Sequence, residues 1–397
     1  MTKEFIHEST QFLTVDDTGS TKQIQEVINA NNKFAFDLYS QLNKSKKENI
    51  FYSPFSIFTA LAMVYEGVKG QTAKEIKSVF HFPENDILRP NFATIYNKIN
   101  KKNDLYELNV VNALWVQKDY KLLEEYLLII KKYYDGKIMN LDFIGETEVS
   151  RQIINLFIEQ QTANKIKNLI SQGGINALTR LIFTNAVYFK GIWEQEFDKT
   201  NTCEQDFKVT STKIIKTPMM RMSADEHLFN YIDIDGLQIL ELPYKENKIS
   251  MLILLPKESI NIIELNLTIE KLNELKGQMK KEKLDVIVLP KFELDIQYLM
   301  ADILSSMGMP AVFSKEDADF SGVNREKNLW IDQIIHRAFV KVDEEGTEVA
   351  GATTVVCEGA AQRQIKIFNA DHPFIFLIQE KDSGNILFLG RVVNPAK

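Results

Sequence analysis

Residues 330–376 read WIDQIIHRAFVKVDEEGTEVAGATTVVCEGAAQRQIKIFNADHPFIF, and the expected fold follows from this stretch. Its first part, 334–342, mixes aliphatic and polar residues at close to a two-residue period, which predicts a β-strand that ends in the acidic turn Asp343–Gly346. The next ten residues, 347–356 (TEVAGATTVV), are small or β-branched, contain no proline and carry a charge only at Glu348. We interpret this segment as a latent strand, able to join a sheet but without a place in one.

Read as a strand, the segment has one uncharged face and one face that carries its acids. The uncharged face holds Thr347, Val349, Gly351, Thr353, Val355, Cys357 and Gly359, and the other holds Glu348, Ala350, Ala352, Thr354, Val356 and Glu358. The first face can be buried under a sheet without enclosing a charge. Residues 359–364 (GAAQRQ) have no periodicity and no large apolar side chain, so we expect an exposed, cleavable loop there.

Three motifs resemble the serpin family. EEGTEVAGATTVV at 344–356 is similar to the hinge of the serpin reactive-centre loop, and DHPFIFLI followed by LFLGRVVNP is similar to the paired C-terminal strands. NIFYSPFSIFTALAMVYEGVKGQTAKEI at 49–76 resembles a third serpin signature. The resemblance covers nearly the whole chain, from about Asn31 to Pro395.

The resemblance implies an α+β fold in a single domain, with N-terminal helices packed on three β-sheets and an exposed reactive-centre loop. We expect residues 1–20 to form a loose extension and 346–366 to form the hinge and loop. It also implies a protein that is not an enzyme but a suicide-type inhibitor of serine, or cysteine, endopeptidases. In this family the protease cuts the loop and becomes acylated, and the cut loop then enters the main sheet as a new strand and traps the covalent complex.

The hinge composition is that of inhibitory serpins. The residues that the resemblance assigns to it are Glu344, Gly346, Thr347, Val349, Ala350, Gly351, Ala352 and Thr353. Relatives usually carry alanine at the position of Val349, and valine stays apolar and compatible with a strand. We therefore expect an effect on insertion rate rather than on mechanism.

The family pattern, counted from Gly346, implies a scissile bond at Ala360–Ala361. A small alanine suits elastase-like or subtilisin-like proteases with shallow pockets. The competing bond is Arg363–Gln364, which suits trypsin-like enzymes but requires a longer inserting segment. We favour Ala360–Ala361.

Two further regions are implied by the resemblance. The shutter, beneath the centre of the main sheet, consists of Ser53, Ser56, Asn185 and His336. The breach, where insertion begins, contains Trp193, Lys291 and Glu344, the last two as an ion pair. A buried Asn and His must find hydrogen-bond partners, and exchangeable partners would give the sheet two acceptable states. On the residues alone, a lone histidine on an apolar strand is more often a satisfied core histidine, whereas the resemblance favours the shutter role for His336.

The rest of the sequence predicts helices mainly in the N-terminal half of the chain and β-strands mainly in the C-terminal half, which is an α+β arrangement. Helical periodicity or capping predicts helices over 22–42, 54–65, 88–100, 122–134 and 148–162, with Ser53 as an N-cap before Pro54 and a capping box from Thr72 to Glu75. Strands are predicted over 108–116, 181–189 and 285–294, as hairpins within 217–256, and as a final pair joined by 381–384.

Composition limits the other possibilities. The chain is 45% hydrophobic and 25% charged, its net charge of −7 disfavours a nucleic-acid partner, and it lacks an apolar run of membrane-spanning length. Cys203 and Cys357 form no disulfide framework. We expect a monomer that polymerises when destabilised, needs no metal or cofactor, and is either cytoplasmic or, if this is a mature chain, extracellular.

The two rival functions are those of a non-inhibitory serpin and of an enzyme. A non-inhibitory serpin, acting as a carrier, chaperone or storage protein, often carries bulky, charged or proline residues in the hinge, which 347–356 lacks apart from Glu348. An enzyme would need a catalytic motif, and we find no Gly-x-Ser-x-Gly, His-Glu-x-x-His, phosphate loop or metal-spaced Cys/His cluster. Five lysines could form a patch that binds a polyanion, although a solvated helix face is the favoured interpretation. They are Lys98, Lys101, Lys102, Lys131 and Lys132.

Overall fold

The computed structural model describes residues 21–45, 48–100, 106–224, 226–347 and 366–397. Its helices are α1 (Thr21–Ser45), α2 (Pro54–Gly67), α3 (Gly70–Phe80), α4 (Asn85–Ile99), α5 (Glu124–Tyr133), α6 (Thr147–Gln161), α7 (Ile260–Glu264), α8 (Ile269–Gln278), α9 (Met300–Met307) and α10 (Ser321–Asn324). The long helices lie at the predicted places because their apolar residues recur at helical spacing. Helices α7 to α10 were not predicted; three of them have at most eight residues and carry little periodicity, whereas α8 is as long as α5, which was predicted.

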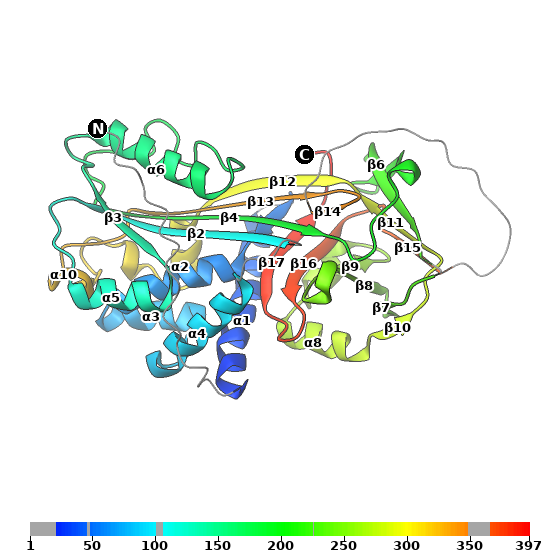
Figure 1. The fold of residues 1–397 in the computed structure, drawn as a ribbon, viewed down its shortest axis with the longest axis horizontal. Coiled ribbons are helices and arrows are strands. Elements are labelled where there is room, and N and C mark those ends of the chain that lie inside the picture. The colour runs from blue at the N-terminus through cyan, green and yellow to red at the C-terminus, as the bar shows by residue number, and fades with distance from the viewer. Residues whose placement is uncertain (1–20, 46–47, 101–105, 225, 348–365) are drawn as a thin grey trace.

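The main sheet has six strands and crosses the molecule (Figure 1). Its order is β12 (Phe292–Leu299), β13 (Gln333–Val342), β14 (Gly346–Thr347), β4 (Leu181–Ile192), β2 (Tyr106–Gln117) and β3 (Lys137–Leu141). Figure 1 shows α6 above this sheet and α1 to α5 below one end of it. Both faces are covered, which explains why β4 reads as a nearly continuous apolar run.

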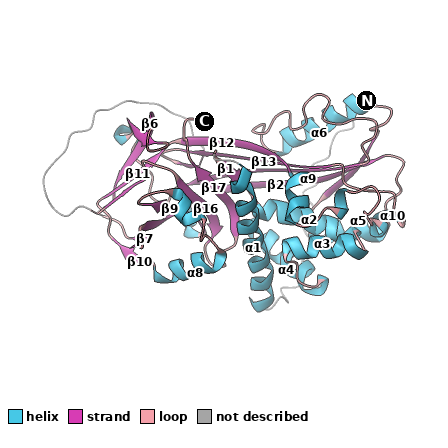
Figure 2. Ribbon diagram, turned by 180° about the vertical axis from the view of Figure 1, so that it is seen from behind, coloured by secondary structure: helices cyan, strands magenta, loops and turns pink. Residues whose placement is uncertain are grey.

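The other two sheets lie at the opposite end from most helices (Figure 2). The seven-stranded sheet runs β1 (Ile50–Tyr52), β17 (Ile386–Val392), β16 (Phe374–Glu380), β9 (Ile249–Pro256), β8 (Leu237–Pro243), β7 (Phe229–Ile234) and β10 (Lys280–Glu282). The four-stranded sheet runs β15 (Ile367–Asn369), β11 (Val286–Pro290), β6 (Ile214–Ser223) and β5 (Cys203–Lys208). The predicted hairpins and the final strand pair are therefore present.

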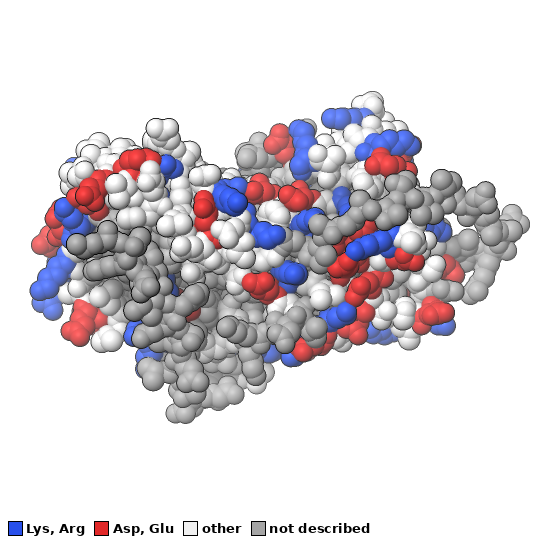
Figure 3. Space-filling view, turned by 45° about the horizontal axis from the view of Figure 1, so that its top comes forward, with Lys and Arg blue, Asp and Glu red and all other residues white. Residues whose placement is uncertain are grey.

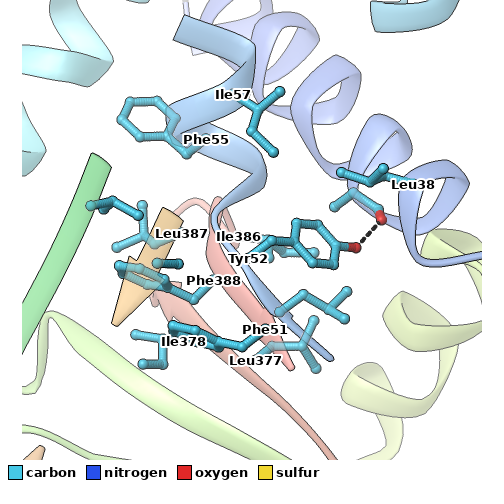
Figure 4. Packing of buried hydrophobic residues seen from close by; sticks show 14 of the residues in the cluster. Leu38, Phe51, Tyr52, Phe55, Ile57, Leu377, Ile378, Ile386, Leu387 and Phe388 are labelled. Carbon is cyan, nitrogen blue, oxygen red and sulfur yellow. Dashed lines mark hydrogen bonds between the residues drawn. The ribbon is translucent and has the colours of Figure 1, made fainter. Parts of the chain in front are cut away.

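The main sheet separates two hydrophobic clusters. The larger cluster joins helices α1 and α2 to β16 and β17, and Figure 4 shows Phe51, Tyr52, Phe55 and Phe388 packed there. The Tyr52 hydroxyl donates a hydrogen bond of 2.6 Å to the backbone carbonyl of Ala35, which satisfies its one buried polar atom. The smaller cluster lies between the sheet and α6. Side chains that alternate along β2, β4 and β13 thus enter different cores.

Helix α2 begins as the sequence predicts. Ser53 is its N-cap, the Ser53 side chain accepts a hydrogen bond of 3.1 Å from the Ser56 backbone N–H, and Pro54 is the first helical residue. The helix is buried almost all round. Because Ser53 and Ser56 lie at its first turn, the cap also fixes two polar side chains beneath the sheet.

Two sequence predictions were wrong. Helix α3 begins at Gly70 and not at a capping box, because the Thr72 hydroxyl contacts the backbone of Asp317 and Asp319 instead of capping a helix. The predicted strand over 285–294 is two strands in different sheets, β11 and β12, which meet at Lys291. The apolar pattern continues across this break, so periodicity could not reveal it.

Candidate functional site

Strand β14 is wedged between β13 and β4 at one end of the main sheet. It is antiparallel to both, and Thr347 is the partner of Val342 on β13 and of Gly191 on β4. Beyond β14 the parallel strands β13 and β4 pair directly, from Gln333–Ile182 to Phe339–Tyr188. The start of the hinge therefore already occupies the position of an additional strand.

Close approach of backbones limits which residue can precede Thr347. A Cβ atom added to Gly346 would lie 2.0 Å from the carbonyl oxygen of Gly191. A Cβ atom on Gly191 would in turn lie 2.8 Å from the ring of Tyr244. A side chain at position 346 would therefore push β14 away from β4, and one at position 191 would displace the ring of Tyr244.

The ion pair between Glu344 and Lys291 that the resemblance implies is present in the structure. Glu344 accepts hydrogen bonds of 2.7 Å from Lys291 Nζ and of 2.7 Å from the Thr202 hydroxyl. The side chains of Glu344 and Lys291 are 4% and 26% exposed. Burial alone would raise the pKa of Glu344, but the hydrogen bonds from Lys291 and Thr202 outweigh it and lower the pKa below its usual value.

The acidic turn before β14 is also held through its backbone. The indole Nε1–H of Trp193 donates to the Asp343 carbonyl at 3.0 Å, and the Trp193 backbone N–H donates to the Glu345 carbonyl at 2.9 Å. The Phe197 backbone N–H donates to the Glu344 carbonyl at 2.8 Å. The segment after β4 therefore holds all three consecutive acids in place.

Tyr244 supports the hinge from below. Its ring stacks on Trp193 with centroids 4.5 Å apart, and its hydroxyl lies 2.8 Å from the Thr347 hydroxyl. Burial raises the pKa of Tyr244 well above its usual value, so the hydroxyl is protonated and can donate. Thr347, the second residue of β14, therefore has its side chain in a buried, hydrogen-bonded place.

The four predicted shutter residues meet at the centre of the sheet, on the face toward α2. His336 on β13 and Asn185 on β4 are register partners, and His336 Nδ1 contacts Asn185 Oδ1. His336 Nε2 accepts from the Ser53 backbone N–H at 3.2 Å, and Asn185 Nδ2 donates to the Ser56 carbonyl at 3.0 Å. The cluster is fully buried.

Burial sets the protonation of this cluster. It lowers the pKa of His336 from 6.5 to about 3, so the ring is neutral at physiological pH. Because a backbone N–H can only donate, Nε2 must accept from Ser53, and the single ring proton is on Nδ1. His336 therefore donates to Asn185 across the β13–β4 boundary.

The family of the chain follows from a comparison with known proteins. A family model described as serpin (serine protease inhibitor) matches residues 29–395. The chain belongs to the serpin family. The α+β fold with helices and three sheets, predicted from the sequence, is confirmed by this match and by solved serpin structures.

Individual serpins are similar over most of their length. An uncharacterized serpin-like protein of Thermococcus kodakarensis is 42% identical over 379 residues, which cover 94% of this chain and 87% of that protein. Leukocyte elastase inhibitor A of Mus musculus is 37% identical over 380 residues, covering 94% of this chain and 100% of that protein. The crystal structure of uncleaved ovalbumin has a TM-score of 0.84 and 32% identity, covering 92% of this chain and 99% of that chain.

Part of the predicted site of this serpin lies outside the described residues. These residues are Val349, Ala350, Gly351, Ala352, Thr353, Ala360, Ala361 and Arg363, together with Cys357. Among the lysines of the possible polyanion-binding patch, Lys98 forms an ion pair with Glu380 at 3.0 Å. Residues 101–102 lie outside the described residues. On the face seen in Figure 3, acidic and basic side chains are interspersed among the described residues.

Sequence reasoning missed several residues that contact the predicted site. Thr202, Tyr244 and Asn112 carried no motif, although Asn112 is a polar residue within the apolar run 108–116, which is a usable signal. Within the described ranges, no three His, Cys, Asp or Glu side chains are placed to hold a metal ion. No helix in the described part of the chain is long and apolar enough to cross a bilayer.

Proposed function

We propose that this serpin inhibits serine endopeptidases by admitting its cut reactive-centre loop between β13 and β4. The observation that carries this proposal is β14, whose two residues lie between these strands and antiparallel to both. Insertion would continue a ladder that has already begun. The shutter and breach residues would then control how easily β13 separates from β4.

The register of the hinge supports insertion without sliding of the sheet. Each further residue of an antiparallel strand pairs with the preceding residue on each neighbour. Thr347 lies between Val342 and Gly191, so a continued strand would bring Thr353 between His336 and Asn185. His336 and Asn185 already face each other, so β13 would move sideways and keep its level along β4.

In the proposed mechanism the protease carries out the covalent steps, and the serpin acts only when its cut loop moves. The protease serine attacks the scissile carbonyl, the peptide C–N bond breaks, the new amine leaves with the C-terminal part of the loop, and an ester joins the serpin to the enzyme. Water would normally hydrolyse this ester. We propose that insertion carries the tethered protease along the sheet first and distorts its site before hydrolysis occurs.

The free energy available for insertion is large enough to drive this movement. The inserted strand would form roughly ten more backbone hydrogen bonds than the β13–β4 ladder loses, each worth ~1 kcal/mol net. Burial of a few β-branched side chains would add ~1.5 kcal/mol or more each. The sum is on the order of 10 kcal/mol, and it is inaccessible while both ends of the loop are tethered.

The target specificity stays a proposal based on sequence. We favour cleavage at Ala360–Ala361 by an elastase-like or subtilisin-like protease over cleavage at Arg363–Gln364 by a trypsin-like one. The similarity to leukocyte elastase inhibitor A agrees with this preference.

One experiment tests the mechanism and the scissile bond together. The serpin is incubated with an elastase, a subtilisin and a trypsin, and the products are separated on a denaturing gel. A denaturant-resistant band at the summed mass supports trapping, whereas cleavage without that band favours a carrier, chaperone or storage role. Mass spectrometry of the released fragment locates the cut, and a fragment that begins at Gln364 would overturn the assignment to Ala360–Ala361.

A further inference from the structure

One buried amide beside the shutter has an unused donor. Asn112, in the middle of β2, is 6% exposed and lies directly opposite Asn185 on β4. Its Oδ1 accepts a hydrogen bond of 2.5 Å from Asn185 Nδ2. Its own Nδ2 is buried and has no hydrogen-bond partner among the residues that the structure describes.

The orientation of Asn112 is determined by its neighbours. The Ser53 backbone N–H donates to His336 Nε2, which places the ring proton on Nδ1 and requires an oxygen of Asn185 to face it. The Asn185 amide nitrogen must then point toward Asn112, so an oxygen of Asn112 faces it. Turning either amide over would place two donors against each other. The unpaired group at the end of this chain is therefore an N–H donor and not an acceptor.

Asn185 Oδ1 has one acceptor site in use, and separation of β13 from β4 would vacate it. His336 is on β13 and would move away with that strand. Asn112 is on β2, and insertion between β13 and β4 does not break the pairing of β2 with β4. Asn112 Nδ2 would then be a donor beside the vacated oxygen, on the side of β4 away from the inserted strand. The two opposed amides could pair head to tail, each donating to the other.

We propose that Asn112 is a positioning residue of the shutter that holds a reserve donor for Asn185 Oδ1. The donor is unsatisfied while the sheet is closed and becomes satisfied when the sheet opens. Asn112 therefore stabilises the opened, loop-inserted sheet more than the closed one. This inference rests on the proposed insertion mechanism and adds to it a group that lowers the cost of breaking the His336–Asn185 contact.

The test compares the same substitution in two forms of the protein. Asn112→Leu removes the amide, and Asn109→Leu is the matched control on the same strand, because Asn109 is partly exposed and bonds Glu107 instead of the shutter. Unfolding by guanidinium is measured for intact protein and for protein cut in the loop. We expect Asn112→Leu to lower the folding equilibrium constant of the cut form about tenfold more than that of the intact form, as the loss of one additional hydrogen bond predicts.

The outcomes separate this inference from the proposed function. If the cut wild type is no more stable than the intact wild type, the insertion mechanism itself fails. If the cut wild type is stabilised but Asn112→Leu weakens both forms equally, the reserve donor is refuted. Should Asn112→Leu not fold, Asn112→Ala also removes the donor without adding a larger apolar side chain, and the cost of the cavity applies to both forms and cancels in the comparison.

Discussion

Reversing the charge of Glu344 should loosen the hinge far more than reversing the charge of its neighbour. Glu344→Lys removes two acceptors that Lys291 and Thr202 use at 2.7 Å each, and it places a second cation against Lys291 in a site where the native carboxylate is 4% exposed. Breaking a buried pair costs about 3 to 5 kcal/mol. Because Lys291 is 26% exposed and can turn toward water, we expect a loss of about 2 to 3 kcal/mol in the free energy of unfolding.

Glu345→Lys is the matched control. Glu345 pairs with Lys199, but their side chains are 32% and 40% exposed, so solvent screens the pair and its loss should be a small fraction of the loss at Glu344. Both variants keep the backbone hydrogen bonds of the turn, since these use main-chain carbonyls. Guanidinium unfolding gives the free energies, and size-exclusion chromatography after mild heating gives the monomer fraction. If the two variants lost equal free energies of unfolding, or if the monomer fraction of Glu344→Lys equalled that of wild type, the proposed role of the Glu344–Lys291 pair in holding the hinge would be refuted.

The pKa of His336 makes stability depend on pH in a direction that can be checked. Its folded pKa of about 3 lies below the unfolded value of 6.5, so its contribution is complete above pH 6.5 and is lost as the pH falls toward 3. Between pH 7 and pH 5 the free energy of unfolding should fall by about 2 kcal/mol through this group. His336→Gln cannot titrate, so its free energy of unfolding should depend less steeply on pH, and an equal dependence in variant and wild type would contradict the prediction. Gly346→Ala puts a methyl 2.0 Å from the Gly191 carbonyl, so it should displace β14 and convert inhibition into simple cleavage, seen as a higher stoichiometry of inhibition. An unchanged yield of complex would show that the close approach of Gly346 to Gly191 does not limit insertion.

The local sequence determined much of the fold and the identity of several site residues. The Ser53–Pro54 cap, the apolar stripe of α1 and the strand before Asp343 depend on neighbours within a few residues, so their patterns could be read directly. The alternation of charge after Gly346 likewise indicated a strand with one buriable face. The resemblance to serpins then supplied the shutter and breach residues, which the residue pattern alone could not distinguish from ordinary core.

The tertiary structure decided which side chains meet. His336 and Asn185 are 151 residues apart, and only the register of β13 on β4 brings them into contact. The pairing of β2 with β4 likewise places Asn112 opposite Asn185, and the packing of Tyr244 places its hydroxyl beside that of Thr347. A sequence pattern encodes the period and burial of a strand, but it does not encode the partner of that strand, because pairing depends on how distant segments pack around a shared core.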